Sequence, residues 1–414
     1  MTSAPFRVGK WLPSDEQALE NWIAHVLHDL DPDAPLHPDV LELKDLIEGN
    51  ADLFMLFHLM FNQVPHKPTY NRDPSGSPQV RNYLVMLQLL NRILTTAPEY
   101  NKTVMVGCPI NAILDWPMGT KAGFAVFLHE KVNHQLKKIL NSWAMYLSSP
   151  ESRYVLNQDP HKGWLGRDAM EAMPGFEEDY LCQPDQPFHG FRSWDDFFTR
   201  QFRPGRRPVV EPDNSSAIAN ACESAPYRLA HGVQRRDRFW IKAQPYSLED
   251  MLRDDPTVDR FVGGTVYQAF LSPTTYHQWH APVSGKVIKV RHIDGTYYSE
   301  TLAEGFDPSG PSESQAYLTS MATRTLIFIE ADNPDIGLVC FMGVGMSEVS
   351  SCEALVHAGQ YVEKGDTLGM FHFGGSTYCL VFGPDVKLDF DLHGQTPGLH
   401  AGNIRVNEVL ARVK

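Results

Sequence analysis

The chain has 414 residues, of which 43% are hydrophobic and 21% are charged, and its formal net charge at pH 7 is −14. This composition argues against global disorder, and the length favours two folded regions over a single core. The acidic balance argues against binding to nucleic acid or to an acidic membrane surface, since both would repel the chain at long range.

No apolar run approaches the roughly 18 to 20 residues that a membrane-spanning helix needs. The N-terminus also lacks the apolar segment of a secretory signal. We therefore expect a cytoplasmic protein without stable membrane insertion. The 6 cysteines have no CxxC spacing and indicate reduced thiols, and no residue pattern indicates a metal site.

The first half of the chain is predicted to be helical. Apolar residues recur there at steps of three and four residues, which is the period of a helix with one buried face. The expected helices cover residues 15–30, 38–49, 79–98 and 123–149. A loop at residues 66–78, rich in turn-forming residues, separates two of them.

The second half changes to short runs rich in β-branched and aromatic residues, bounded by turn formers. The expected strands are residues 265–270, 285–293, 325–331, 336–344 and 377–382. The predicted fold class is therefore α+β. We expect a helical N-terminal domain at residues 1–190 and a strand-rich domain at residues 191–414, with the boundary at about residues 185–205.

The segment GMFHFGGSTYCLVF places Gly374 and Gly375 directly before Ser376. Glycine has no Cβ, so the Gly375 carbonyl can be approached closely and the backbone can bend in ways barred to other residues. Attack of the Ser376 hydroxyl on that carbonyl, followed by β-elimination and hydrolysis, would leave a pyruvoyl group. On its own, a Gly-Gly-Ser sequence is more often a flexible turn.

Two further segments carry recognisable motifs: SWDDFFTRQFRPGRRPV, and AFLSPTTYHQWHAPVSGKVIKV with His277 and His280. Together with the glycine-serine site they resemble the phosphatidylserine decarboxylase family, which shares FFxRxxxPGxRPx, LSPxxYHxxHxP and a terminal GST or GSS element. All three occur here in family order, over about residues 190–414. The resemblance implies a decarboxylase core with barrel-sandwich-like β architecture.

The resemblance also implies the chemistry. The family cuts its own chain, here between Gly375 and Ser376, and the two fragments remain associated. Ser376 would become a covalent pyruvoyl cofactor, to which a substrate amine binds as a Schiff base before carbon dioxide leaves. Pyridoxal phosphate is not expected, because no lysine with phosphate-binding surroundings stands out. A metal is not expected either, because no residue pattern indicates a metal site.

By the same resemblance, His280 is the general base that takes the Ser376 proton, and His277 assists Schiff-base chemistry and protonation. The two imidazoles could exchange these roles. Membrane-associated relatives carry an aspartate in a PADG-like segment where this chain has IANACESAPY, so Glu223 is the nearest candidate carboxylate. Glu223 completes a triad, or it is structural and the base works as a dyad; the sequence leaves both open.

The whole chain, including its N-terminal half, resembles the fungal decarboxylases of this family that act on L-tryptophan. An aromatic L-amino acid is therefore the implied substrate, foremost tryptophan, which would give tryptamine and carbon dioxide. One alternative is a phosphatidylserine decarboxylase that makes phosphatidylethanolamine. Another is a non-catalytic binding module, because APVSGKVIKV and VHAGQYVEKGDTLGMF resemble the halves of the lipoyl and biotinyl carrier fold.

Overall fold

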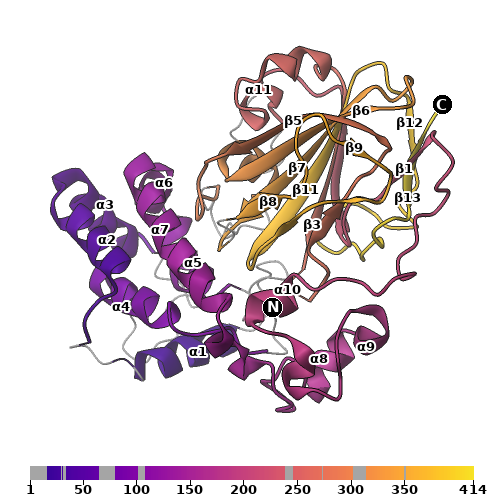
Figure 1. Ribbon diagram of the computed structural model, residues 1–414. Coiled ribbons are helices and arrows are strands. Elements are labelled where there is room, and N and C mark those ends of the chain that lie inside the picture. Colours follow the sequence, from indigo (N-terminus) through magenta and orange to yellow (C-terminus); the bar gives the residue numbers. More distant parts are fainter. Residues whose placement is uncertain are drawn as a thin grey trace, which may run out of the picture. The chain divides into compact units, whose positions relative to one another are not determined.

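The computed structural model shows a mixed α+β fold, which confirms the predicted class (Figure 1). Its described residues are 16–28, 30, 34–64, 80–100, 108–237, 246–272, 274–301, 314–348 and 351–414. The chain divides into two compact units that interleave along the sequence, the helical unit and the sheet unit. The helical unit comprises Met1–Ala172, Gln186–Asp196 and Thr296–Ser314, and the sheet unit comprises Met173–Asp185, Phe197–Gly295 and Gln315–Lys414.

The helical unit contains most of the helices. They are α1 (Glu16–His28), α2 (Pro38–Glu48), α3 (Ala51–Asn62), α4 (Tyr83–Ile93), α5 (Pro109–Met118), α6 (Lys121–Leu128), α7 (Glu130–Leu147), η3 (Pro150–Val155), α8 (Arg167–Ala172) and η4 (Pro187–Gly190). The predicted loop at residues 66–78 lies outside the described residues. The chain passes from the helical unit to the sheet unit within α10 (Trp194–Phe198).

Polar side chains cap several of these helices. Asn50 accepts hydrogen bonds from the backbone N–H of Asp52 (3.0 Å) and Leu53 (3.1 Å), and so begins α3. Asn82 begins α4 in the same way, by accepting from Val85 N–H at 3.0 Å. Each cap satisfies backbone donors that have no partner inside the first turn of a helix.

The predicted helix at residues 123–149 is two helices, α6 and α7. They meet at His129, whose ψ of 124° is extended and interrupts the ladder of backbone hydrogen bonds. No glycine or proline lies at the break, so the apolar periodicity predicts one continuous helix there. The 18 residues of α7 bury one apolar stripe, and Trp143 on that stripe donates to the Thr96 carbonyl at 2.9 Å.

The sheet unit is built on a seven-stranded antiparallel sheet in the order β2-β3-β11-β7-β6-β5-β9. Its strands are β2 (Ala225–His231), β3 (Thr265–Leu271), β5 (Gly285–Ile293), β6 (Arg324–Ala331), β7 (Leu338–Met346), β9 (Tyr361–Val362) and β11 (Gly375–Phe382). All five predicted strands are confirmed within it. Among the described residues the sheet does not close into a barrel.

Two three-stranded sheets complete the strand-rich part, in the orders β4-β10-β8 and β1-β13-β12. Their strands are β4 (Gln278–His280), β8 (Cys352–Ala354), β10 (Thr367–Phe371), β1 (Ala217–Ala219), β12 (Leu388–Phe390) and β13 (Val409–Val413). The short helices of this unit are α9 (Phe176–Asp179), α11 (Leu248–Met251), η5 (Pro256–Arg260) and α12 (Gln315–Met321).

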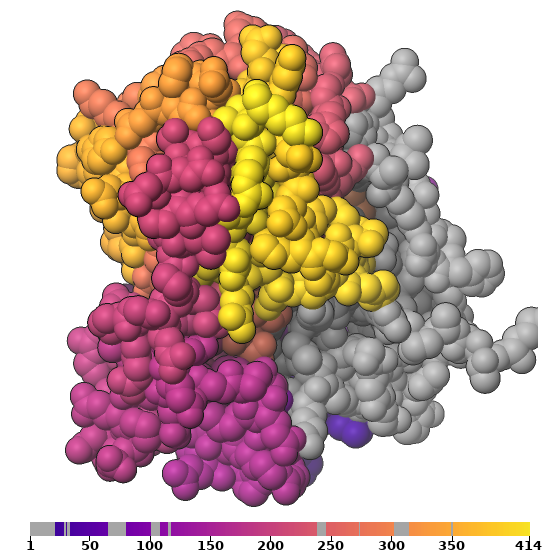
Figure 2. All heavy atoms as spheres, turned by 90° about the vertical axis from the view of Figure 1, so that its right-hand side faces the viewer, coloured from indigo at the N-terminus to yellow at the C-terminus, as the bar shows by residue number. Residues whose placement is uncertain are grey.

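The segment before β1 lies beside the C-terminal part of the chain. Figure 2 shows this face, with a crimson segment next to the yellow C-terminal residues. The Val210 N–H donates to the Asn407 carbonyl at 3.0 Å, and β1 pairs with β13 in antiparallel fashion. The C-terminal residues therefore form part of the sheet unit's folded structure.

A buried aromatic cluster fills one side of the large sheet. Trp279 on β4 packs tilted against Phe341 on β7, with 5.2 Å between the ring centroids. A Cβ at Gly343 would lie 2.8 Å from the Trp279 ring, and one at Gly369 would lie 2.7 Å from it. Glycine at both positions is what allows the indole to approach the two strands so closely.

Within the described residues, no helix has the length and apolar character needed to cross a membrane.

Candidate active site

Ser376 lies at the start of β11, in the middle of the large sheet. It pairs with Leu271 on β3 and with Gly345 on β7. Its side chain is completely buried, and among the described residues its Oγ has no hydrogen-bond partner. A buried hydroxyl without a partner is costly to a fold and is uncommon in native structures. The predicted nucleophile is therefore a buried, unengaged hydroxyl.

The two glycines before Ser376 occupy unusual surroundings. Gly374 has a φ of 141°, a conformation that residues with a side chain rarely adopt. A Cβ on Gly375 would lie only 3.3 Å from both the Cβ and the carbonyl oxygen of Met346. The backbone is thus bent at Gly374 and tightly enclosed at Gly375. The bend requires glycine, because its φ is positive.

Side chains alternate along a strand, so Ser376 lies on the same face of β11 as Tyr378. Tyr378 belongs to the buried core and stacks on Phe341 at 5.7 Å. Thr377 lies on the opposite face and donates to the Ala269 carbonyl at 2.8 Å. The Ser376 hydroxyl therefore belongs to the core side of the sheet, where Trp279 also packs.

His277 lies next to the chain that leads into Ser376. Its carbonyl accepts the backbone N–H of Phe371, at the end of β10, at 3.0 Å. Its ring stacks on Phe198 with 4.0 Å between centroids, and Phe198 in turn meets Phe373 edge-on at 5.2 Å. Phe371 and Phe373 precede Ser376 by only a few residues, so the structure brings His277 and the cleavage segment together.

The surroundings of His277 favour the neutral imidazole. Its side chain is fully buried, and this burial lowers its pKa well below the usual value; the nearby positive charge of Arg200 lowers it further. Neither ring nitrogen makes a hydrogen bond of normal geometry within the described residues, although the Thr275 backbone lies close enough to favour the protonated ring slightly. A neutral imidazole with available nitrogens is suited to accept a proton.

His280 is held by two hydrogen bonds. Its Nδ1 lies 2.6 Å from the Gly365 carbonyl oxygen, and its Nε2 lies 2.9 Å from the Tyr276 hydroxyl. A carbonyl can only accept, so Nδ1 carries the hydrogen and Nε2 accepts from Tyr276 in the neutral ring. Burial lowers the pKa of His280, while the Gly365 carbonyl and the Asp366 charge oppose this effect.

Glu223 is bound to other groups. Its carboxylate receives hydrogen bonds from Nε and Nη2 of Arg207 at 3.1–3.3 Å, and from the Val406 N–H at 2.9 Å. Within the described part of the chain it makes no hydrogen bond to His277 or His280. The backbone still brings the segments together, since the His280 N–H donates to the Ala221 carbonyl at 2.8 Å. An orienting role for Glu223 stays a prediction.

Sequence reasoning did not single out the residues that hold the two histidines. These are Phe198 and Arg200 near His277, and Tyr276 and Gly365 at His280. Three of these residues lie inside the two motif segments, so the motifs could have pointed to them: Phe198, Arg200 and Tyr276. Gly365 lies 85 residues from His280 along the chain, and no local pattern links the two.

The described residues contain no group of histidine, cysteine, aspartate and glutamate side chains that could hold a metal ion. The surroundings of Ser376 suit a covalent cofactor made from the chain itself. A pyruvoyl group made from Ser376 would take the place of a buried side chain whose oxygen has no partner. The residues present therefore fit the cofactor that the sequence resemblance implies.

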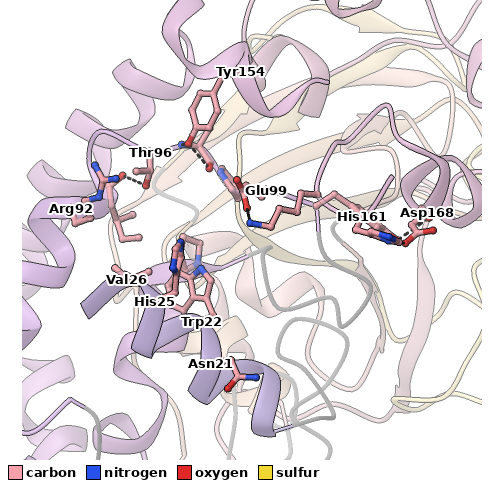
Figure 3. Close-up of a pocket in the computed structure, with 16 residues that line it drawn as sticks. Asn21, Trp22, His25, Val26, Arg92, Thr96, Glu99, Tyr154, His161 and Asp168 are labelled. Atoms are coloured by element: carbon pink, nitrogen blue, oxygen red, sulfur yellow. Dashed lines mark hydrogen bonds and ion pairs between the residues drawn. The ribbon is translucent and has the colours of Figure 1, made fainter. Parts of the chain in front are cut away.

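A separate pocket of about 700 Å³ lies within the helical unit (Figure 3). Trp22 and His25 of α1 line it, together with Tyr154, whose hydroxyl lies 3.1 Å from the Ala97 carbonyl. His161 also lines it and contacts the buried carboxylate of Asp168 at 2.8 Å. The predicted nucleophile, histidines and Glu223 are not among its lining residues.

Comparisons with known proteins identify the family of the chain. Two family models, both described as phosphatidylserine decarboxylase, match residues 37–173 and 194–410.

An L-tryptophan decarboxylase of Psilocybe cubensis is 37% identical over 396 residues, which is 91% of this chain and 86% of the relative. The decarboxylase iboD of Amanita muscaria is 43% identical over 353 residues, 78% of this chain and 99% of the relative. Phosphatidylserine decarboxylase proenzyme 3 of Schizosaccharomyces pombe is 32% identical over 215 residues, 51% of this chain and 21% of the relative. The chain belongs to the phosphatidylserine decarboxylase family of carboxy-lyases.

Proposed function

We propose that this protein is a self-processing, pyruvoyl-dependent decarboxylase of aromatic L-amino acids, with L-tryptophan as its principal substrate and tryptamine and carbon dioxide as products. The observation that carries the proposal is the buried Ser376 hydroxyl, which has no hydrogen-bond partner among the described residues and follows the bent Gly374-Gly375 backbone. The segment that leads into Ser376 also contacts His277, whose imidazole is neutral, and a nucleophilic hydroxyl needs such a base within reach.

Self-cleavage uses atoms of the chain and one water. The Ser376 Oγ attacks the Gly375 carbonyl carbon, loses its proton to a base, and converts the peptide bond into an ester. β-Elimination then releases the Gly375 carboxylate and leaves a dehydroalanine at position 376. Hydrolysis of its enamine nitrogen releases ammonia and leaves the pyruvoyl group.

The strand pairing supports fragments that remain associated after this cut. Ser376–Phe382 pairs along its whole length with β3 on one side and with β7 on the other. In addition, β13 of the C-terminal fragment pairs with β1 of the N-terminal one. Cutting one peptide bond at the start of β11 leaves these ladders in place.

Bound covalently at position 376, the pyruvoyl group supplies a ketone that reacts with the substrate amine and accepts the electrons released with carbon dioxide. His277 starts as the neutral base, because burial and Arg200 lower its pKa, and an imidazolium formed there gives its proton up readily. His280 is fixed in one tautomer by Gly365 and Tyr276, which defines Nε2 as its basic nitrogen.

The tryptophan assignment rests on the names of relatives. Two of them, from Psilocybe cubensis and Psilocybe cyanescens, are called L-tryptophan decarboxylase and match most of this chain. The relative at 43% identity is called decarboxylase iboD, a name that does not specify tryptophan. Phosphatidylserine is the second candidate substrate, favoured by the family models and by proenzymes that match about half of this chain.

Intact-mass analysis of the purified protein tests self-cleavage. We expect two fragments, residues 1–375 and a pyruvoyl-capped fragment from position 376 to Lys414. The Ser376→Ala variant should remain uncut. Ser320→Ala is the matched control, since it removes another buried hydroxyl that has no partner among the described residues. Normal cutting of Ser376→Ala would disprove the nucleophile.

Substrate choice needs a separate measurement. The matured protein is incubated with tryptophan, phenylalanine, tyrosine or phosphatidylserine vesicles, and the products are identified by mass. We expect tryptamine as the dominant product. Reductive trapping of the Schiff base with a hydride donor should add the substrate to the fragment that begins at position 376, with loss of one water and gain of two hydrogens. Phosphatidylethanolamine as the dominant product would instead support the lipid decarboxylase.

A further inference from the structure

Three consecutive residues at the C-terminal end of α10 and just after it contact the segment that contains His277. Phe198 stacks on the His277 ring at 4.0 Å. The Thr199 carbonyl accepts a hydrogen bond from Nε2 of Gln278 at 2.8 Å. Arg200 donates through Nη2 to the Thr274 carbonyl at 2.7 Å and to the Thr275 carbonyl at 3.0 Å. The FFTR motif therefore forms the support on which the histidine segment rests.

Arg200 is an unusual component of this support. Its side chain is only 2% exposed, and among the described residues its Nε has no partner and its guanidinium forms no ion pair with a carboxylate. Its hydrogen bonds go to backbone carbonyls, including Phe197 O at 3.2 Å. Burying a charge without a counter-ion is costly, so a fold retains it only where other interactions compensate.

Aromatic rings supply part of that compensation. The Arg200 guanidinium lies 4.5 Å from the ring centre of Tyr180, 5.1 Å from that of Phe197 and 5.5 Å from that of Phe176. Ring faces attract a cation without neutralising it. The positive charge of Arg200 is thus stabilised but remains, and it acts on the nearby His277.

We propose that Arg200 is a positioning residue for His277, holding the Thr274-Thr275 turn through its guanidinium so that the imidazole is presented to the cleavage and decarboxylation site. The proposal rests on the proposed function, because it assumes that His277 serves that site. A lysine could not replace Arg200, since a single ammonium lacks the planar fork that reaches both carbonyls and the Phe197 backbone.

The charge of Arg200 acts on the pKa of His277 in addition to burial. Within the described part of the chain, the His277 ring stacks on the uncharged Phe198 ring and is influenced by the Thr275 backbone and by the cationic Arg200. Replacing Arg200 by neutral glutamine removes the positive charge, so the pKa of His277 should rise. Loss of packing would raise this pKa as well, because water admitted to the site stabilises the protonated ring. Arg200→Lys separates the two causes, since it keeps a positive charge while it loses the packing of the guanidinium.

The first test measures self-cleavage and its chemical rescue. Arg200→Gly should cleave on the order of 100-fold more slowly than the parent protein, the cost of a misplaced catalytic group. Millimolar methylguanidinium should restore a large part of the rate in Arg200→Gly, but not in Arg200→Lys. Arg206→Gly is the matched control from the same motif, because Arg206 is more exposed and donates to the Glu178 carbonyl. Cleavage of Arg200→Lys at the parent rate would overturn the proposal.

The second test does not depend on cleavage. In uncut Ser376→Ala protein, NMR of isotope-labelled histidine follows the His277 ring. Arg200→Gln should shift its titration to higher pH by more than Arg200→Lys does, because lysine keeps a positive charge, while Arg206→Gln should leave it in place. An unchanged His277 titration would overturn the proposal even if cleavage is slow. If the parent protein never cleaves but the titration shifts, the proposed function fails and the Arg200–His277 relationship stands.

Discussion

The Tyr276 hydroxyl and the His280 Nε2 lie 2.9 Å apart; Tyr276 is buried and His280 is half-buried. Burial raises the pKa of the Tyr276 hydroxyl, so the phenol keeps its proton and acts as the donor. The basic nitrogen of His280 is therefore occupied in the uncut chain. It becomes available to another group only when Tyr276 releases it.

Replacing Tyr276 by phenylalanine should destabilise the fold. The variant leaves Nε2 of His280 buried without a donor, and an unsatisfied buried acceptor costs about 1–3 kcal/mol. The free energy of unfolding in urea measures this loss. Tyr361→Phe is the control, since the Tyr361 hydroxyl donates to Asp332 at the surface and its loss should change stability by no more than about 0.5 kcal/mol.

Acid should weaken the fold through His277 and His280. Burial lowers the pKa of both below the usual histidine value of about 6.5, so near and below that pH the unfolded chain binds protons that the folded chain does not. The free energy of unfolding should therefore fall as the pH drops below about 6.5, by up to about 1.4 kcal/mol per pH unit for each histidine. The fall ends once the pH reaches the lowered pKa of the folded state.

Urea unfolding across this pH range checks the linkage. His277→Gln should reduce the slope of stability against pH, because one of the two depressed groups is gone. His357→Gln, which replaces an exposed histidine, should leave the slope as it is. An equal slope in the parent and in His277→Gln would contradict the expectation.

Gly343→Ala should be destabilising because its Cβ would lie 2.8 Å from the Trp279 ring. Overpacking of this kind costs about 1–3 kcal/mol. Adding Trp279→Phe to the same chain removes the clashing ring and should recover part of the loss. A double-mutant cycle of unfolding free energies measures this coupling, and strictly additive effects would show that the indole does not press on Gly343.

Glu223→Gln separates the two roles considered for this residue. The variant weakens the bonds to Arg207 and to the Val406 N–H, so the free energy of unfolding should fall by about 1–3 kcal/mol. Self-cleavage is then measured per folded molecule. A lower cleavage rate per folded molecule supports an orienting role for Glu223 towards a histidine. An unchanged rate per folded molecule assigns Glu223 to the stability of the fold alone.

Local sequence patterns predicted the elements well where one period ran uninterrupted. The strand at residues 377–382 and the helix at 38–49 appear as β11 and α2 within a few residues. Residues 51–62 were not predicted as a helix, because α3 is apolar on almost every side and lacks a clear stripe. The break at His129 was missed because its extended ψ has no local sequence cause.

The sequence by itself determined which residue types are available for chemistry: a serine after two glycines, two histidines three residues apart, and the two motif segments around them. Only the tertiary structure decided how they are held. It stacked His277 on Phe198, placed the Arg200 guanidinium on the turn before it, and bound His280 to Gly365 and Glu223 to Arg207.

The division of the chain into two units also could not be predicted fully from the sequence. The sequence predicted one boundary near residues 185–205, whereas the structure assigns residues 173–185 to the sheet unit and residues 296–314 to the helical unit. The physical reason is that periodicity reports only on neighbours within a few turns of the chain. Hydrogen bonds between residues 85 or 183 positions apart, such as those of Gly365 and Val406, form only when the whole fold closes.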